Sequence, residues 1–154
     1  MIFSDFVCME AIQLQLTALD KEGVIRELTG ALVSAGEIDK QEHENIVQRI
    51  LERERLGTTG IGGGVAVPHA KHIGVTHTIG TIGVSQTGID FESLDGAHVR
   101  VFFLLVSPPD HSEQHLQVLE TVSRHLRDAT FCNFLTQSTT VDEVRQVLED
   151  SEQQ

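Results

Sequence analysis

The segment VRVFFLLV, residues 99–106, decides the fold class of this 154-residue chain. It is an almost continuous run of β-branched, aromatic and aliphatic residues, which is typical of a strand buried on both faces of a sheet. Two shorter segments with the same composition, residues 65–67 and 78–84, precede it and are interpreted as further strands. Residues 57–64, which come before all of these, are interpreted as a loop because of their glycines.

Helical patterns lie on the N-terminal side of these strands. Asp20 can cap a helix that runs through about residue 35, with apolar residues at helical spacing and Gly36 as a stop. Asp39 and Glu42 have the spacing of a capping box. The sequence therefore predicts a second helix from this point up to Gly57, and its apolar face consists of Ile46, Val47, Ile50 and Leu51.

Further helices are predicted after the central strand. Pro108 and Pro109 end that strand, and Ser112 can cap a helix through about residue 127. The apolar residues repeated at helical spacing in this helix, which we expect to face the core, are Leu116, Leu119, Val122 and Leu126. Thr140 and Glu143 mark the start of one last helix.

Helices before and after a group of strands indicate an α/β domain. We expect a three-layer α/β/α sandwich, in which a mixed β-sheet is flanked by helices on both faces. The chain has the length of one domain, and we find no internal repeat or linker in it. We therefore assign residues 1–150 to a single domain and expect residues 151–154 to be a frayed tail.

Composition excludes several classes of function. The formal charge of −12 and the pI near 4.9 argue against binding of nucleic acid, which requires clustered Lys and Arg, and favour protein partners with basic surfaces. No apolar run approaches the roughly 18 residues of a membrane span, and the N-terminus lacks a secretory leader. We therefore expect a cytoplasmic protein with no direct membrane insertion. Cys8 and Cys132 are interpreted as buried free thiols.

The predicted loop at residues 57–64 has the composition of an anion cradle. Its glycines can adopt positive φ and bring backbone N–H groups close to a ligand. The segment has no GK[ST] ending of a Walker loop, and it follows a helix rather than the strand that a dinucleotide fingerprint requires. A phosphate site and a tight turn without any ligand are both compatible with this segment.

One histidine follows the loop directly. Pro68 fixes its own φ and restricts Val67 to extended geometry, so the imidazole of His69 leaves a stiff segment. A neutral imidazole is a nucleophile at neutral pH, and a phosphoryl group on it needs donors for three oxygens. The alternative is that His69 is an ordinary core histidine.

Five segments of the chain carry a resemblance to a known family. They are RERLGTTGIGGGVAVPHAKH (53–72), KEGVIREL (21–28), GIDFESLDGAHVRVFFLLVSPPD (88–110), HLQVLETVSRHL (115–126) and TVDEVRQVL (140–148). In their order along the chain they resemble the enzyme IIA proteins of the bacterial phosphoenolpyruvate-dependent phosphotransferase system, of the fructose, mannitol and nitrogen-regulatory type. The resemblance covers nearly the whole chain.

The resemblance implies a phosphoryl carrier. It implies that His69 accepts a phosphoryl group from the phosphocarrier protein HPr or an HPr paralogue, while Arg53 and His115 stabilise that group. It requires neither a metal nor another cofactor. The backbone loop expected to bind the phosphate consists of Thr59, Gly60, Ile61, Gly62, Gly63 and Gly64.

The family that the chain resembles has a nitrogen-regulatory branch and a sugar-specific branch, and the sequence is compatible with both. The chain has no IIB-like cysteine motif, linker or membrane segment, which favours the nitrogen-regulatory branch that acts by binding target proteins. The alternative is a fructose- or mannitol-type component that passes phosphate to a IIB domain for sugar uptake. Three positions depart from the family pattern, because Gly63 replaces a frequent asparagine, Val67 the usual isoleucine and Ala70 a glycine.

Two rival readings concern the histidines. His69 with His72, or His111 with His115, could be ligand pairs of a metal-dependent hydrolase. The chain could also be a binding module that keeps the fold without the chemistry. The remaining histidines are interpreted as surface or packing residues, and they are His43, His77, His98 and His125.

Overall fold

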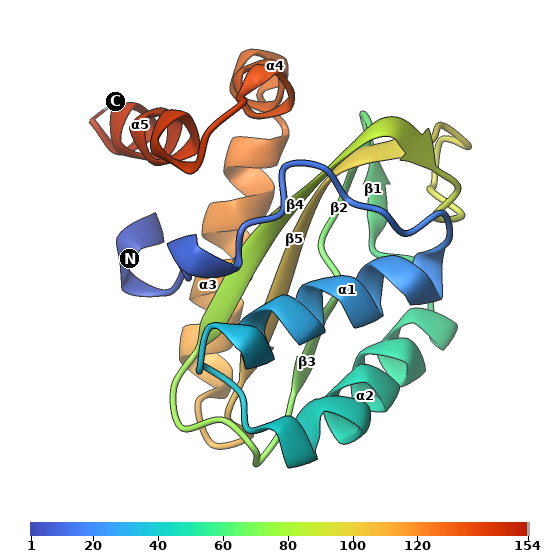
Figure 1. Ribbon diagram of the computed structural model, residues 1–154, viewed down its shortest axis with the longest axis vertical. Helices are drawn as coiled ribbons and strands as arrows, with labels where there is room; N and C mark the ends of the chain where they lie inside the picture. Colours follow the sequence, from blue (N-terminus) through green and yellow to red (C-terminus); the bar gives the residue numbers. More distant parts are fainter. Residues whose placement is uncertain (154) are drawn as a thin grey trace.

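A five-stranded mixed sheet forms the centre of the computed structural model, which describes residues 1–153 (Figure 1). Strand β5 (Val99–Ser107) pairs antiparallel with β4 (Ile79–Ile89) along one edge. Along its other edge it pairs in parallel with β2 (Val65–Ala66) and then with β3 (His69–Lys71). The run that we expected to be a central strand is therefore the central strand.

Side chains of β5 alternate between two hydrophobic cores. Phe102 and Leu104 belong to one buried cluster, and Phe103 and Leu105 belong to the other. Burial of each such side chain stabilises the fold by about 1.5–3 kcal/mol. Helices cover both clusters, so the predicted three-layer α/β/α sandwich is confirmed.

Helices α1 (Lys21–Ser34) and α2 (His43–Arg55) form the layer over the first cluster. The side chain of Asp20 caps α1 by accepting a hydrogen bond from the amide of Gly23 at 2.8 Å, as predicted.

The predicted capping box at the start of α2 is wrong. Asp39 accepts from the amide of Gln41 at 2.9 Å and starts the 3₁₀ turn η3 (Lys40–Glu42), and α2 begins only after that turn. Short side chains such as Asp can satisfy an amide two residues ahead, which competes with the helical capping geometry.

Helices α3 (Ser112–Leu126), α4 (Ala129–Gln137) and α5 (Val141–Glu152) form the opposite layer. Ser112 is the first residue of α3 rather than its cap, and its hydroxyl donates to the carbonyl of Pro109 at 3.3 Å. The sequence did not predict α4, because a helix of nine residues shows little apolar periodicity.

Both ends of the chain pack against this second layer. The N-terminal segment includes the 3₁₀ turns η1 (Phe3–Asp5) and η2 (Met9–Ala11) and runs beside β4 (Figure 1). The amide of Phe3 donates to the carboxylate of Glu152 at 2.6 Å. Ser151 and Glu152, two residues of the expected tail at 151–154, belong to the last turn of α5. Gln154 lies outside the described residues.

The cysteines, the start of the glycine loop and the hydropathy of the helices were also the subject of predictions. Both cysteines are free and buried, as interpreted from the sequence. Residues 60–62, expected to be loop, form the short strand β1 (Gly60–Gly62), which pairs antiparallel with β2. Within residues 1–153, no helix has both the length and the hydropathy of a membrane span.

Candidate active site: a histidine pair in an apolar cleft

His69 is the first residue of β3 and follows a proline that interrupts the strand. Pro68 has no N–H to donate, but its carbonyl accepts from the amide of Leu105 at 3.0 Å. Residues 65–71 therefore stay aligned with β5 across the proline, and β3 resumes with His69 opposite Leu105. The stiff segment predicted before the histidine follows β2, which pairs with both β1 and β5, and β3 continues along the same side of β5.

The imidazole of His69 has a defined tautomer. Its Nδ1 lies 2.7 Å from the carbonyl oxygen of Val67, and a carbonyl can only accept a hydrogen bond. Nδ1 therefore carries the proton, and Nε2 carries the lone pair. Burial lowers the pKa of His69, and the nearby guanidinium of Arg53 lowers it further, against the opposing effect of the Val67 hydrogen bond. The ring is a neutral nucleophile at neutral pH.

His115 lies beside His69, although 46 positions separate them in sequence. It stands on the first turn of α3, it is 4% exposed, and its ring centroid is 5.5 Å from that of His69 with the planes tilted by 52°. Burial lowers the pKa of His115 to about 4, and His69 and Lys71 add to that effect. Its Nδ1 lies 2.6 Å from the hydroxyl of Ser107.

Both rings line one cleft of about 590 Å³ between α2, β3 and α3. Its lining combines two imidazoles, three basic side chains, one carboxylate and several apolar side chains. They are Arg49, Glu52, Arg53, Leu56, His69, Ala70, Lys71, His115, Leu116 and Leu119. The structure thus brings together the three side chains singled out from the sequence, and the guanidinium of Arg53 is held by the carbonyl of Gly57 at 2.8 Å.

The glycine loop does not join this group. None of residues 59–64 lines the cleft, and the amide of Gly63 donates to the carboxylate of Asp95 at 3.0 Å. A Cβ on Gly60 would lie 2.5 Å from the hydroxyl of Ser93, so glycine is needed there for close packing. Thr59 donates through both its amide and its hydroxyl to the buried carboxylate of Glu54. These contacts give the loop a packing role at the end of α2 and the start of β2, and its binding of phosphate stays a prediction.

Sequence reasoning missed other residues of the cleft. Arg49 lies four residues before Arg53 on the same face of α2, and this spacing was a usable signal. Lys71 follows His69 by two, so both side chains lie on one side of β3, and its ammonium donates to Ser112 at 2.9 Å. Leu116 was expected in the core but is 66% exposed, because α3 turns His115 inward instead.

The metal-site reading lacks a third ligand. Among residues 1–153, no group of three or more His, Cys, Asp or Glu side chains is placed to share a metal ion. Nδ1 of His72 accepts from the amide of Gly74 at 2.9 Å, which gives this buried ring a structural role.

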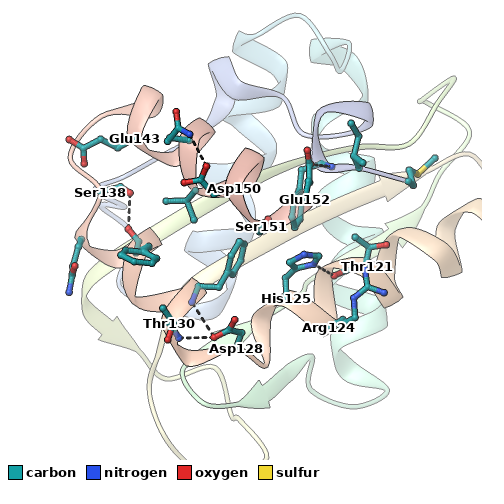
Figure 2. A pocket seen from close by; sticks show the side chains of 18 residues that line it. Thr121, Arg124, His125, Asp128, Thr130, Ser138, Glu143, Asp150, Ser151 and Glu152 are labelled. Atoms are coloured by element: carbon teal, nitrogen blue, oxygen red, sulfur yellow. Dashed lines mark hydrogen bonds between the residues drawn. The ribbon is translucent and has the colours of Figure 1, made fainter. Parts of the chain in front are cut away.

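A second cleft of about 760 Å³ lies at the other end of the domain, between the N-terminus, α3, α4 and α5 (Figure 2). His125 lies in it, with Nδ1 2.8 Å from the carbonyl of Thr121 and its ring 4.9 Å from that of Phe3. Its acidic side chains have structural partners, as Asp128 caps α4 and Glu152 binds the amide of Phe3. This cleft holds neither His69 nor His115.

Comparison with known proteins gives relatives of two kinds. A nitrogen regulatory protein of Bradyrhizobium diazoefficiens is 34% identical over 148 residues, which are 96% of this chain and 95% of that protein. A phosphotransferase-system fructose-specific EIIA component of Haloferax volcanii is 36% identical over 118 residues, 77% of this chain and 75% of that protein.

The similar solved structures also include both a nitrogen regulatory protein and a sugar-specific protein. The nitrogen regulatory protein IIA-Ntr of Neisseria meningitidis has a TM-score of 0.85 at 26% identity, covering 95% of this chain and 98% of that one. The mannitol enzyme IIA of Escherichia coli, solved in complex with phosphorylated enzyme IIB, has a TM-score of 0.75 at 27% identity, covering 92% and 95%.

The family model for "Phosphoenolpyruvate-dependent sugar phosphotransferase system, EIIA 2" matches residues 5–151. This match spans the sheet, both helical layers and the cleft with the histidine pair. The chain therefore belongs to the EIIA 2 family, the phosphocarriers of the phosphoenolpyruvate-dependent sugar phosphotransferase system.

Proposed function

We propose that Nε2 of His69 is the phosphoryl acceptor of this chain. The observation that carries the proposal is the hydrogen bond from Nδ1 to the carbonyl of Val67, because it leaves Nε2 as the nitrogen with the lone pair. The ring lies in a cleft that a donor protein can reach, and burial keeps it neutral. A neutral imidazole in a fixed orientation is an activated nucleophile.

In the transfer, a bond forms between Nε2 of His69 and phosphorus while the bond from phosphorus to the donor atom breaks. The electron pair of the broken bond stays on the donor, and His69 keeps its Nδ1 proton. The substituted ring gains positive charge, which the carbonyl of Val67 stabilises through the same hydrogen bond. No proton has to move on this chain.

Arg53 and His115 are the proposed stabilising residues. The transferring group is loosely bonded and carries charge on its three equatorial oxygens, so catalysis depends on positioned donors. Arg53 already acts on the electrostatics of His69, and His115 lies 5.5 Å away between ring centroids. Lys71, on the same side of β3, adds a further positive group to the cleft.

The proposed donor is HPr or an HPr paralogue, which meets this chain in the cytoplasm. Leu56 and Leu116 are 85% and 66% exposed at the rim of the cleft and provide apolar area for a docking protein. Exposed apolar groups beside a reactive centre are typical of an interaction surface.

Incubation with phosphoenolpyruvate, purified enzyme I and purified HPr tests this proposal. We expect one acid-labile phosphate per chain, and none when HPr is omitted. Full incorporation into the His69→Ala variant would contradict the assignment.

For the branch, the nitrogen-regulatory reading has the stronger support. The alignment with the nitrogen regulatory relative covers nearly all of this chain and nearly all of that protein. The TM-score with IIA-Ntr exceeds that with the mannitol enzyme IIA. A phosphoryl group adds about 1.5–2 negative charges. On His69 it would offset the positive groups Arg49, Arg53 and Lys71, weaken docking of an acidic partner and create a site for arginines.

The alternative is a sugar-specific component that passes its phosphate to a IIB domain. The fructose-specific relative, at 36% identity, favours it. The two are separated by adding purified fructose- and mannitol-type IIB domains to the phosphorylated protein. The regulatory reading predicts that the phosphate stays on this chain for minutes, whereas its loss within seconds, with formation of a sugar phosphate, would establish the alternative.

A further inference from the structure

We infer that Ser107 is a positioning residue, whose hydroxyl donates to Nδ1 of His115 and so fixes the Nε2 proton of that ring toward the phosphoryl group. The juxtaposition that carries the inference is a buried line of polar side chains behind the site. Nδ1 of His115 lies 2.6 Å from the Ser107 hydroxyl, which lies 2.9 Å from the hydroxyl of Thr78. The inference rests on the proposed function of the cleft.

The number of protons on His115 determines what this ring can donate. A cationic imidazole donates from both nitrogens, but this ring is neutral because it is buried beside His69 and Lys71. A neutral imidazole has one N–H, so it can serve as a donor to the phosphoryl oxygens only if that proton is on Nε2. Nδ1 must then accept a hydrogen bond.

The only partner that Nδ1 of His115 has among the described residues is the hydroxyl of Ser107. Ser107 is the last residue of β5 and is fully buried, so solvent does not compete for its proton. A serine hydroxyl can rotate to donate or to accept. With Ser107 donating to His115, its oxygen is free to accept from Thr78, which is itself 3% exposed.

If the hydrogen bonds ran in the opposite direction along this line, the last hydroxyl would have only a distant acceptor. If Nδ1 of His115 donated to Ser107 and Ser107 donated to Thr78, the Thr78 hydroxyl would have to end the line at Oε1 of Gln114. That distance is 3.5 Å, at the limit of a hydrogen bond. In that arrangement His115 would also present a lone pair to the cleft and repel the phosphoryl oxygens.

The two rings of the cleft are thus assigned opposite tautomers. The hydrogen bond with Val67 keeps the single ring proton of His69 on Nδ1. The hydrogen bond with Ser107 keeps that of His115 on Nε2. One ring offers a lone pair and the other a proton, which are the complementary requirements of a phosphoryl acceptor and of a donor to its oxygens. After phosphorylation, the added negative charge raises the pKa of His115 toward the cationic form.

Long-range ¹H–¹⁵N spectra of the unphosphorylated, full-length protein test the assignment directly. We expect the Nδ1 resonance of His115 at the position of an unprotonated nitrogen and Nε2 at that of a protonated one. The Nδ1–H tautomer of His115 would overturn the inference, while phosphorylation of His69 could still be observed. Conversely, failure of phosphorylation with the expected tautomer would refute the proposed function and with it the role of Ser107 in phosphoryl transfer, while the direction of the hydrogen bond from Ser107 to His115 would still hold.

A variant series adds a kinetic readout. Ser107→Ala should lose the single tautomer of His115 and slow phosphoryl transfer by about tenfold, less than the roughly 10²-fold cost of removing a direct donor. Ser107→Thr keeps the hydroxyl and should restore both properties. Ser85→Ala removes another buried hydroxyl of the same sheet, away from the cleft, and should change neither. An unchanged tautomer and rate in Ser107→Ala would also overturn the inference.

Discussion

Each of the two clefts of this domain holds one histidine, His69 or His125, with its proton on Nδ1, but the surroundings of these two rings differ. Nδ1 of His69 is 2.7 Å from the carbonyl of Val67, and Nδ1 of His125 is 2.8 Å from the carbonyl of Thr121. Each ring therefore keeps its lone pair on Nε2. The larger cleft is the one around His125, so neither cleft size nor tautomer identifies the reactive ring.

The neighbours of the two rings differ in charge and in kind. His69 has a second imidazole at 5.5 Å and shares its cleft with Arg49, Arg53 and Lys71. The ring of His125 packs against aromatic rings, with Phe3 at 4.9 Å between centroids, and carboxylates line its cleft. Positive groups stabilise an incoming phosphoryl group, and carboxylates repel it. The surroundings of a histidine, rather than its tautomer, therefore determine its chemistry in this domain.

The largest expected effect comes from removing one ring or the other. His69→Ala should abolish acid-labile phosphate incorporation from HPr, because the accepting nitrogen is lost. His125→Ala removes an imidazole of the same tautomer and should still reach full incorporation. Phosphate counted per chain after the reaction reaches completion measures both, and equal losses in the two variants would break the comparison.

The next effect concerns the arginines of the two clefts. Arg53→Ala should slow phosphoryl transfer by about 10²-fold, since one charge-stabilising donor is removed. Arg124 lines the other cleft and pairs with Glu120 at 3.3 Å, so Arg124→Ala should leave the rate within twofold. Rapid-quench measurement of the phosphoryl-transfer rate distinguishes them. A normal rate in Arg53→Ala would remove this residue from the site.

A smaller effect is expected from exposed apolar residues at the two clefts. Leu116→Ala should raise the KM for phosphorylated HPr by about fivefold, the roughly 1 kcal/mol typical of an interface residue, without changing kcat. Phe134 is 54% exposed in the other cleft, and Phe134→Ala should not change this KM. Steady-state kinetics with varied HPr give both numbers. If only Phe134→Ala raised the KM, docking would have to occur on the other cleft.

The smallest effect is expected on acidification. The pKa of His69 is lowered by burial, so its NMR titration should have a midpoint below the ordinary 6.5. Because the unfolded chain then binds this proton more readily than the folded chain, the His69 contribution to the free energy of unfolding is present above pH 6.5 and is lost below it. A midpoint at or above 6.5 would contradict the stated role of burial.

Much of the fold could be predicted because its signals are local. The apolar run of β5 identified the central strand, and Asp20 identified the start of α1. The short helix α4 and the 3₁₀ turn η3 were missed, since each depends on capping by one aspartate rather than on a periodic pattern.

The site was predictable only in part because it is assembled from distant segments. The glycine loop and Pro68 pointed to His69, and the resemblance to a family added Arg53 and His115; the fold brings all three into one cleft. The glycines also predicted a phosphate-binding loop at residues 59–64, in which the amide of Gly63 donates to the carboxylate of Asp95. The buried Ser107 has no sequence signal beyond its place at the end of a strand, so only the packing of α3 on β5 reveals it.

The position of the phosphate on the ring tests the central claim most directly. Uniformly ¹⁵N-labelled protein is phosphorylated with phosphoenolpyruvate, enzyme I and HPr, and the imidazole nitrogens are then assigned by long-range ¹H–¹⁵N spectra. The account predicts phosphate on Nε2 of His69, with the Nδ1 proton retained and the ring of His125 unchanged. Phosphate on Nδ1 of His69, or on the ring of any other histidine, would contradict it.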